Sequence, residues 1–323
     1  MAGIRQGSRN VLRRVLYGMG LPRLFGSLRR RLIGPFATAV LAETENGVLL
    51  VPVRDAFVGR ALCFRGSYDP AILRCLLAQC GRDSEVLVVG AHVGAFAIPV
   101  ARKVRKVAAV EANPKTHELL ALNALLNGLR NLEIHHFAAG DRTEDVSFVA
   151  ASTNTGGSRV RMGEWGRRPN FTESPQTVIV PMRRLDDVFP DANFDLIIMD
   201  IEGAEAMALK GMQNLLARSR ALVVEIVEEH LRQIAKINNQ QFLALISPFF
   251  DEAVILPEGR SRQLPSLPKA YPRNAFGELM AACCNRDVVA NVLFRRSSSS
   301  LPLTAGSSDD TSFWKPDVVI SNV

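Results

Sequence analysis

Two acidic residues with one residue between them, Asp200 and Glu202, follow the strand-like run 194–199. On an extended segment, residues two apart share a face, so both carboxylates could point into one site. A buried carboxylate there could take the proton of an attacking hydroxyl or amine, or help to hold a cation. The alternative is that both acids cap the helix expected from Gly203, an effect of about 0.3–1 kcal/mol. We take Asp200 and Glu202 as candidate catalytic residues.

A turn rich in small residues, with Gly90, Ala91, His92 and Gly94, closes the valine-rich run 84–89 and opens an expected helix. Small residues let the backbone approach a ligand, and a helix N-terminus offers free N–H groups to an anion. A dinucleotide motif needs a glycine where His92 stands, so NAD fits poorly. A nucleoside without a pyrophosphate, such as S-adenosylmethionine, does not require a glycine at that position. The alternative is a tight turn that binds nothing.

The next expected strand ends at Glu111, 21 residues after Gly90. An acid about 20 residues beyond such glycines accepts hydrogen bonds from ribose hydroxyls. The alternative is a strand-end acid that caps the following helix, although Asn113 is already well placed to begin that helix. We expect Glu111 to bind a ribose, and we count Asn113 among the cofactor-binding candidates.

Two further strand ends carry polar residues. Ala139 could leave a slot for an adenine ring, and the Asp141 carboxylate could accept a hydrogen bond from the exocyclic amine of that adenine. The alternative is that these residues form a polar turn. Glu225 lies in a group of polar residues at the end of the run 220–227 and is a lesser candidate. No pair of histidines or cysteines has the spacing of metal ligands, so no metal site is assigned.

These candidates sit at the ends of strands in an α/β pattern. Strands that alternate with helices predict parallel βαβ units in a doubly wound sheet. Asn46-Gly47 between two alternating runs predicts a preceding hairpin, with positive φ at both residues. A polar segment over about 145–182 is interpreted as an insertion at the rim of the sheet. The expected strands are 84–90, 106–112, 131–139, 194–199 and 220–227, and the main expected helices are 70–80, 94–104, 114–128 and 204–212.

The excess positive charge is confined to the start of the chain. Residues 1–42 contain eight arginines and no acid, and subtracting these from the 39 Lys and Arg leaves 31 against 32 Asp and Glu. The body is therefore not a surface that coats nucleic acid. The arm could contact an anionic lipid or RNA, could resemble a transit peptide, or could be a solvated leader.

Composition divides the chain into three parts: a basic arm over 1–38, a folded domain over 39–296 and a serine-rich, disordered tail over 297–323. No run of 18 apolar residues predicts a membrane span. The five cysteines favour reduced thiols. We expect a cytoplasmic protein that could lie at a membrane surface; the sequence does not indicate its oligomeric state.

Taken together, the motifs resemble those of the FkbM-like S-adenosylmethionine-dependent methyltransferases, over about residues 60–230. They occur in the order found in that family: VGAHVGAF, VEANPKTHELLALNALLN, FAAGD, TGGSRV, RRLDD and DLIIMDIEGAEAMALKGM, followed by VVEI. The resemblance implies a class I methyltransferase fold of Rossmann-like type, S-adenosylmethionine as cofactor, and O-methylation of a hydroxyl on a small molecule such as a sugar or natural product, or on a glycan.

The resemblance also implies roles for individual residues, and this chain departs from the family in three places. Val88 stands where the family usually has Asp, His92 replaces a favoured Asn, and Ile198-Met199 replaces a segment with Lys. Losing the Asp removes a polar contact from the cofactor pocket. The implied roles place Gly90, Ala91 and Gly94 at the amino-acid and ribose end of the cofactor, Glu111 at the ribose, Asp141 at the adenine, and Asp200 and Glu202 at methyl transfer.

Two other functions remain open at the level of the sequence. The segment EANPKTHELLALNALLN is also similar to tRNA guanine methyltransferases, and the basic arm suits RNA. Those enzymes usually carry an Asn-Pro-Pro-like segment where this chain has Asp-Ile-Glu-Gly, and the body lacks positive charge. A degenerate, non-catalytic nucleoside-binding protein is the other alternative, because Val88 replaces a polar residue of the pocket.

Overall fold

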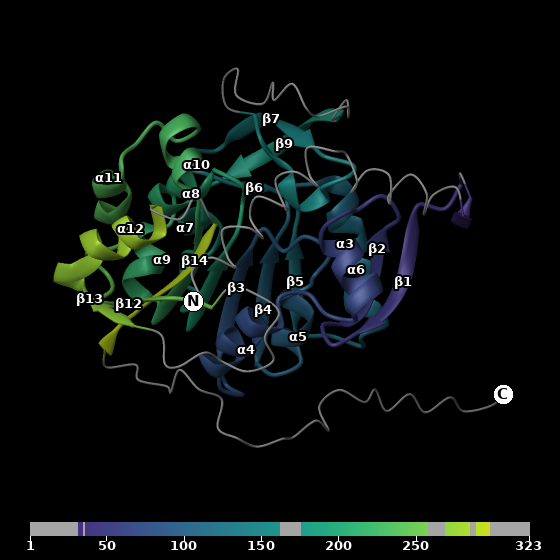
Figure 1. Cartoon of the computed structure of the whole chain (residues 1–323), viewed down its shortest axis with the longest axis horizontal. Coiled ribbons are helices and arrows are strands. Elements are labelled where there is room, and N and C mark those ends of the chain that lie inside the picture. Colours follow the sequence, from purple (N-terminus) through teal and green to yellow (C-terminus); the bar gives the residue numbers. More distant parts are fainter. Residues whose placement is uncertain (1–31, 35, 162–175, 258–268, 285–288, 298–323) are drawn as a thin grey trace, which may run out of the picture.

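A computed structural model describes residues 32–34, 36–161, 176–257, 269–284 and 289–297 (Figure 1). Most of the expected basic arm and nearly all of the serine-rich tail lie outside these residues. The domain boundaries expected at 38 and 296 therefore stay predictions. Within the described part, no helix is both long enough and apolar enough to cross a bilayer.

An eight-stranded sheet forms the centre of the fold, in the order β13-β12-β14-β11-β10-β3-β4-β5. The five neighbouring strands from β11 to β5 are parallel to one another. Strands β14, β12 and β13, at the other edge of the sheet, each run antiparallel to the strand beside them. The parallel strands are β3 (Glu85–Val89), β4 (Lys106–Val110), β5 (Leu132–His135), β10 (Leu196–Met199) and β11 (Ala221–Ile226). The others are β12 (Glu252–Ile255), β13 (Ala270–Pro272) and β14 (Ala290–Arg295). This is the doubly wound α/β sheet that the alternation predicts.

The chain runs from β3 outward to β5 and later returns to β10 on the other side of β3. The order of strands therefore reverses between β3 and β10. In open α/β sheets, ligands bind beyond the carboxyl ends of the strands at such a switch point. The register places Val89 beside Met199, so the glycine turn after β3 and the acids after β10 emerge together.

Helices cover both faces of the sheet. Pro114 begins α6 and Gly128 follows its end in the left-handed conformation, as the sequence predicts. The helix expected over 94–104 is reduced to a short α5, in which Pro99 has no N–H to continue the ladder. The helices are α3 (Val58–Arg65), α4 (Pro70–Ala78), α5 (Ala97–Ala101), α6 (Pro114–Leu126), α7 (Leu185–Val188), α8 (Glu205–Lys210), α9 (Gln213–Arg218), α10 (Glu228–Gln233), α11 (Asn239–Ala244) and α12 (Phe276–Cys284).

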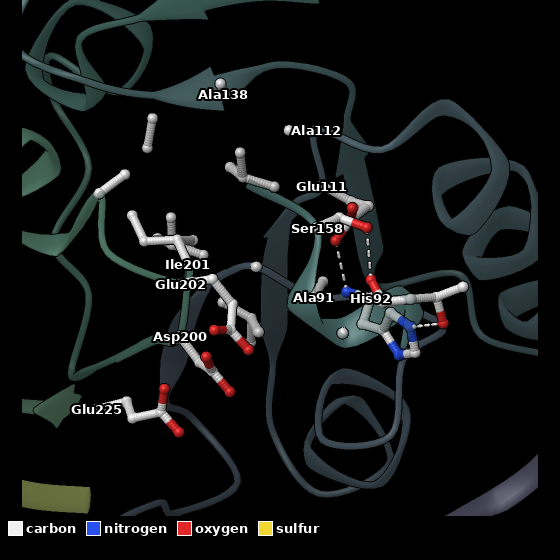
Figure 2. Close-up of a pocket in the computed structure, with 18 of the residues that line it drawn as sticks. Ala91, His92, Glu111, Ala112, Ala138, Ser158, Asp200, Ile201, Glu202 and Glu225 are labelled. Atoms are coloured by element: carbon white, nitrogen blue, oxygen red, sulfur yellow. Dashed lines mark hydrogen bonds between the residues drawn. The ribbon is translucent and has the colours of Figure 1, made fainter. Parts of the chain in front are cut away.

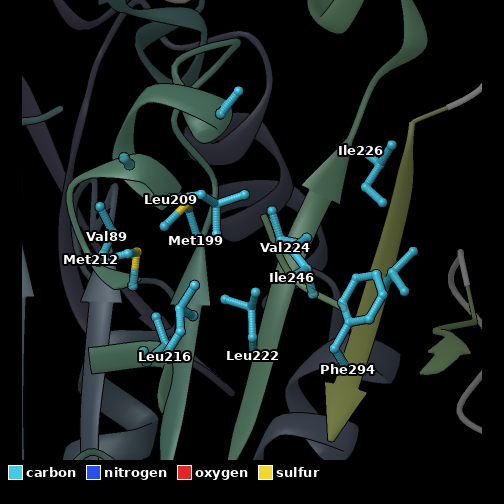
Figure 3. Packing of buried hydrophobic residues seen from close by; sticks show 14 of the residues in the cluster. Val89, Met199, Leu209, Met212, Leu216, Leu222, Val224, Ile226, Ile246 and Phe294 are labelled. Atoms are coloured by element: carbon cyan, nitrogen blue, oxygen red, sulfur yellow. The ribbon is translucent and has the colours of Figure 1, made fainter. Parts of the chain in front are cut away.

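Alternating side chains of β3 enter two separate cores. Leu87 and Val89 belong to the core under α8, α9 and α12, whereas Val86 and Val88 belong to the core under α4 and α5. Figure 3 shows the first core, where strand side chains meet leucine and methionine side chains of the α8–α9 region. Because both faces are buried, the strand is continuously apolar, and its tip is held rigidly.

The N-terminal hairpin is present, but its turn differs from the prediction. Strands β1 (Ala39–Thr44) and β2 (Gly47–Pro52) pair so that Glu45 and Asn46 form the loop. Gly47 has a positive φ and Asn46 does not. The buried Asn46 amide explains this difference, because it donates to the carbonyl oxygens of Tyr68 and Ala95. The residue is fixed by tertiary contacts and not by turn geometry.

The polar segment forms a second sheet at the rim, as expected. Its strands, in the order β6-β9-β7-β8, are β6 (Ala138–Ala139), β7 (Glu144–Ala150), β8 (Arg159–Val160) and β9 (Gln176–Arg183). The single strand predicted over 131–139 is wrong, because only β5 belongs to the main sheet. Ala138 instead pairs with Met182 in the rim sheet. Residues 162–175 of the insertion lie outside the described part.

Candidate active site

A cavity of about 230 Å³ lies at the carboxyl ends of β3, β4, β10 and β11, between the main sheet and the rim sheet. Figure 2 shows two polar groups facing this region: Asp200 and Glu202 after β10 together with Glu225 near the end of β11, and Glu111 with His92. Three predicted residues, Gly94, Asn113 and Asp141, are not in the lining. The predicted residues that do line it are Gly90, Ala91, His92, Glu111, Ala139, Asp200 and Glu202.

The glycine turn is shaped by the neighbouring strand and helix. A Cβ atom on Gly90 would collide with the backbone oxygen of Asp200, and one on Gly94 would press on helix side chains. The N–H groups of Gly90 and Ala91 both donate to the oxygen of Val110, at 2.9 and 3.0 Å, and that of Gly94 donates to Ala91. The expectation that this turn offers free N–H groups to an anion is therefore wrong for these three groups.

Glu111 organises the turns on both sides of it. Its Oε2 accepts from the N–H of His92 at 2.7 Å, and its Oε1 accepts from the N–H of Asn113 at 2.8 Å and from the hydroxyl of Thr116 at 2.9 Å. A carboxylate has about four acceptor positions, so one position remains, on Oε2. Glu111 is thus both a structural acceptor and a lining residue that can accept one hydrogen bond from a ligand.

Asn113 and Asp141 have structural partners. Asn113 begins α6: its Oδ1 accepts from the N–H of Lys115, and its Nδ2 donates to Ser158 Oγ at 3.1 Å. The Asp141 carboxylate pairs with Arg142 at 3.0 Å. Asn113 therefore does not line the cavity itself but holds Ser158, which does.

A chain of hydrogen bonds joins the side chains of Asp55, Thr155 and His92, which come from separate loops. Of these three residues, only His92 was a candidate from the sequence. Thr155 Oγ1 donates to Asp55 Oδ2, and His92 Nε2 lies 2.7 Å from the same hydroxyl. Asp55 also accepts from the N–H of Phe57. Asp55 and Thr155 stand alone in loops 100 residues apart, so only the tertiary fold brings them together. The chain fixes the rim segment against the glycine turn.

Three carboxylates converge on the opposite side of the cavity (Figure 2). One oxygen each from Asp200, Glu202 and Glu225 lies within 4.8 Å of the others, an arrangement whose oxygen ligands could hold a divalent cation. The register that sets Met199 beside Val224 places Asp200 level with Glu225.

Burial and mutual repulsion raise the pKa values of these acids. Burial, with Asp69 and Glu111 nearby, raises the pKa of Asp200 to about 6, although a hydrogen bond from Glu225 opposes the rise. Burial and then Asp200 raise the pKa of Glu202 to about 8. Burial and Asp200 raise the pKa of Glu225 well above its usual range. At neutral pH a proton on Glu225 can thus hydrogen-bond to an ionised Asp200.

Glu205 was not a candidate from the sequence. It accepts the hydrogen bonds at the start of α8 that Asp200 and Glu202 were expected to accept if they were helix caps. Its carboxylate accepts from the N–H groups of Ile201 and Gly203 at 2.9–3.1 Å. Burial raises its pKa to about 7. Asp200 and Glu202 are consequently not needed as caps and are left facing the cavity.

The wall where the family usually has an aspartate is apolar. Val88 lines the cavity beside its register partner Ile198, and both side chains are buried. A ligand meets a hydrocarbon surface at this point. An apolar wall suits the face of a ring and provides no hydrogen bond to it.

Comparison with known proteins gives one family match. The model of the methyltransferase FkbM domain matches residues 89–254, which include both sides of the cavity. No curated protein matches the chain.

Solved structures show more distant likenesses. Methyltransferase FkbM from Methylobacillus flagellatus has 16% identity and a TM-score of 0.39; the alignment covers 67% of this chain and 44% of that one, less than half of its length. Trm5b from Pyrococcus abyssi has 14% identity and a TM-score of 0.42, covering 81% and 57% of the two chains. The M. jannaschii tRNA m1G37 methyltransferase has 13% identity and a TM-score of 0.40, covering 81% and 58%. At such TM-scores these structures carry no argument about the chain.

Proposed function

This chain belongs to the methyltransferase FkbM domain family, and we propose on that premise that it transfers a methyl group from S-adenosylmethionine to a hydroxyl of a sugar, a glycan or a natural product. Family membership supports the transfer of a methyl group. The hydroxyl acceptor is supported by the carboxylates at the strand tips, because a hydroxyl must lose a proton to be methylated.

The residues present fit an adenosine-bearing cofactor. Glu111 has one free acceptor position for a ribose hydroxyl. Gly90 and Ala91 bring backbone close to the cavity, while Val88 and Ala139 give an apolar wall for a ring. S-adenosylmethionine, when bound, supplies an electrophilic methyl group on a sulfonium. The absence of the family aspartate at Val88 predicts weaker binding, without removing the ribose contact.

Asp200 is the proposed base, and its pairing with Glu225 is the observation that carries the proposal. A base works best when its pKa lies near the operating pH, and Asp200 has a pKa of about 6. The protonated Glu225 would hold that carboxylate in place. Glu202, with its higher pKa, would keep the cluster of Asp200, Glu202 and Glu225 from gaining a second full negative charge. Most of the acceleration would come from holding the acceptor in line, up to about 7–11 kcal/mol in well-oriented reactions.

RNA methylation is the weaker alternative. The ionised Asp200 at the cavity would face a phosphate backbone with the same sign of charge, and no lysine or arginine lines the cavity in the described residues. Nucleic-acid affinity depends on lysine and arginine contacts to phosphates. Outside residues 1–42 the chain has one more acid than base.

The test is binding followed by transfer. Titration with S-adenosylmethionine and with its demethylated product should raise the thermal midpoint, because a ligand that binds only the folded state stabilises it. Labelled methyl transfer should then be measured on panels of sugars, glycans and hydroxylated natural products. No thermal shift at millimolar ligand would favour a non-catalytic protein. If the protein bound S-adenosylmethionine but transferred the methyl group only to RNA, the acceptor would be RNA and not a sugar, glycan or natural product.

A further inference from the structure

The hydroxyl of Tyr68 is a polar group at the cavity to which the steps above give no role. Tyr68 lies in the loop between α3 and α4, and its side chain lines the cavity. Within the described residues, the hydrogen bonds of Tyr68 involve its backbone and leave the phenol hydroxyl without a partner. Polar groups away from bulk water are normally paired, so this hydroxyl is available to a ligand.

The phenol of Tyr68 lies within electrostatic reach of the carboxylates. Burial raises the pKa of Tyr68 well above its usual value, and the neighbouring Asp69 adds to the rise. Asp200 and then Glu225 raise it further. The phenol therefore keeps its proton at neutral pH and can donate a hydrogen bond. Figure 2 shows Asp200 and Glu225 across the cavity from Glu111, the proposed ribose ligand.

One buried amide holds Tyr68 in position. The N–H of Tyr68 donates to Oδ1 of Asn46 at 2.8 Å, and its carbonyl oxygen accepts from Nδ2 of Asn46 at 3.1 Å. The same Nδ2 donates at 2.8 Å to the oxygen of Ala95, the residue before Phe96. Asn46 is fully buried. It therefore joins the two backbone segments that carry the rings of Tyr68 and Phe96.

The rings of Tyr68 and Phe96 pack against each other. Their centroids are 5.5 Å apart and their planes are inclined by 48°, which is within the range of favourable aromatic pairs. Both side chains line the cavity. We call these two side chains the aromatic wall. It offers an apolar surface with a single hydrogen-bond donor, the combination by which pockets hold and orient a ring.

The lining has no group that would pair with an anion. Among the described residues, no lysine or arginine lines the cavity, whereas Asp200 is ionised at neutral pH. The nearby Arg159 lies outside the lining and donates to the oxygen of Gly157. A phosphate or carboxylate on the acceptor would therefore be desolvated beside a charge of its own sign, which is costly.

We propose that the aromatic wall binds the ring of an uncharged sugar, with the Tyr68 hydroxyl donating to a second oxygen of the sugar that is methylated. This proposal rests on the proposed function and narrows its acceptor to neutral sugars. The C–H groups of a pyranose form apolar faces that can pack on an aromatic ring, while its hydroxyls need hydrogen-bond partners. Asp200 would accept from the reacting hydroxyl, and Tyr68 would fix the orientation of the ring.

The first experiment measures acceptor binding without turnover. The full chain is mixed with the demethylated cofactor and with the methyl glycosides of glucose, galactose, mannose and rhamnose. Saturation-transfer NMR then identifies the glycosides that bind. The phosphate monoesters of the first three sugars are the anionic counterparts. We expect at least one neutral glycoside to bind and its phosphate monoester not to bind.

The decisive variant is Tyr68→Phe, which removes the hydroxyl and keeps the ring. Affinity for the bound glycoside should fall about two- to tenfold, the usual effect of losing one hydrogen bond between uncharged groups. Affinity for the demethylated cofactor should not change. Phe96→Leu is the second variant; it keeps the hydroxyl, removes one ring of the wall and should weaken glycoside binding by a similar factor.

The matched control is Tyr271→Phe, which removes the same hydroxyl from a tyrosine on β13, outside the cavity lining. It should leave the affinities for the glycoside and the cofactor unchanged. The thermal midpoint of each variant shows that it is folded at the temperature of the measurement.

Three outcomes would overturn the proposal. The first is binding of none of the neutral glycosides, or equal binding of the phosphate monoesters. The second is equal glycoside affinity in Tyr68→Phe and the parent, even if the parent binds the cofactor and transfers methyl groups. The third is binding of catechol in place of every glycoside, which would assign the wall to a phenol. Glycoside binding that depends on Tyr68 in a chain without affinity for the cofactor would instead support the aromatic wall and overturn the methyl transfer.

Discussion

His92 Nε2 lies 2.7 Å from the hydroxyl oxygen of Thr155, and that hydroxyl donates its own proton to Asp55. The hydroxyl must therefore accept from His92, which places a proton on Nε2. Nδ1 of His92 is buried without a partner in the described structure. The glycine turn and the rim segment are coupled through one hydroxyl.

Replacing Thr155 by Val should separate the rim segment from the glycine turn. Asp55, whose side chain is fully buried, and His92 would both lose a partner. A buried polar group left unsatisfied costs about 1–3 kcal/mol, so the free energy of unfolding should fall by at least that amount. Denaturant unfolding measures the loss, and titration with the demethylated cofactor should show weaker binding.

Thr155→Ser is the matched control for this change. It keeps the hydroxyl and removes one methyl group, so both hydrogen bonds can persist. Its stability and ligand affinity should lie close to those of the parent. If the Val and Ser variants were equally stable and bound equally well, the hydroxyl would have no positioning role.

Glu111→Gln should reduce cofactor binding at least tenfold. Three donors converge on the carboxylate, from His92, Asn113 and Thr116, and an amide turns one acceptor oxygen into a donor. The amide NH2 would face at least one of these donors and disturb the turn beside the ribose position. Isothermal titration with the demethylated cofactor measures the effect.

The matched control for Glu111 is Glu118→Gln, which changes an exposed acid on α6. It alters the total charge equally and should leave cofactor affinity unchanged. Circular dichroism must show that the Glu111 variant is folded at the temperature of titration. A folded variant that retained the cofactor as well as its parent would contradict the ribose assignment.

Asp200→Asn should lower turnover by about 10²–10⁴-fold, the usual contribution of a general base. Asparagine keeps the size of the side chain and can still bond to Glu225, so affinity for the demethylated cofactor should change little. In the parent, the rate should fall as pH drops below about 6, where Asp200 takes up a proton. Steady-state rates across pH, with binding measured in parallel, check both points. Equal losses of binding and turnover would indicate a structural role.

Local patterns were sufficient to predict the five parallel strands of the central sheet and part of the site, whereas the antiparallel strands β12, β13 and β14 were not among the expected strands. Glu111 and Asp200 each end an apolar strand, and parallel strands bring their ends to one edge. The sequence therefore indicated both residues before their contacts were known. Glu225 was only a lesser candidate, because its importance depends on the register that sets it level with Asp200.

Other features depend on long-range contacts that no local pattern records. Asp55 and Thr155 are ordinary polar residues in loops until the rim sheet folds over the glycine turn. The sequence predicts Asn46 as a turn residue, yet its side chain is buried and donates a hydrogen bond to the carbonyl oxygen of Ala95. The glycine at position 90 was explained by a ligand, whereas the oxygen of Asp200 already requires it.

The raised pKa values predict that stability falls as pH rises through neutrality. Glu202 has an ordinary pKa of 4.5 when unfolded and about 8 when folded, so between these values the folded state binds more protons. Its stabilising effect is present on the acid side of this window and is lost toward pH 8. Glu225 acts in the same direction. Each proton contributes a slope of up to about 1.4 kcal/mol per pH unit.

Urea unfolding between pH 6 and pH 8 measures this slope, and Glu202→Gln should flatten it because a glutamine cannot ionise. The titration is made in EDTA, since a divalent cation on Asp200, Glu202 and Glu225 would hold the carboxylates ionised and remove the effect. Glu118→Gln, on the exposed face of α6, should retain the slope of the parent. Stability that stayed level or rose across this range in the parent, or an equal slope in Glu202→Gln, would show that the three carboxylates are not crowded in the folded protein.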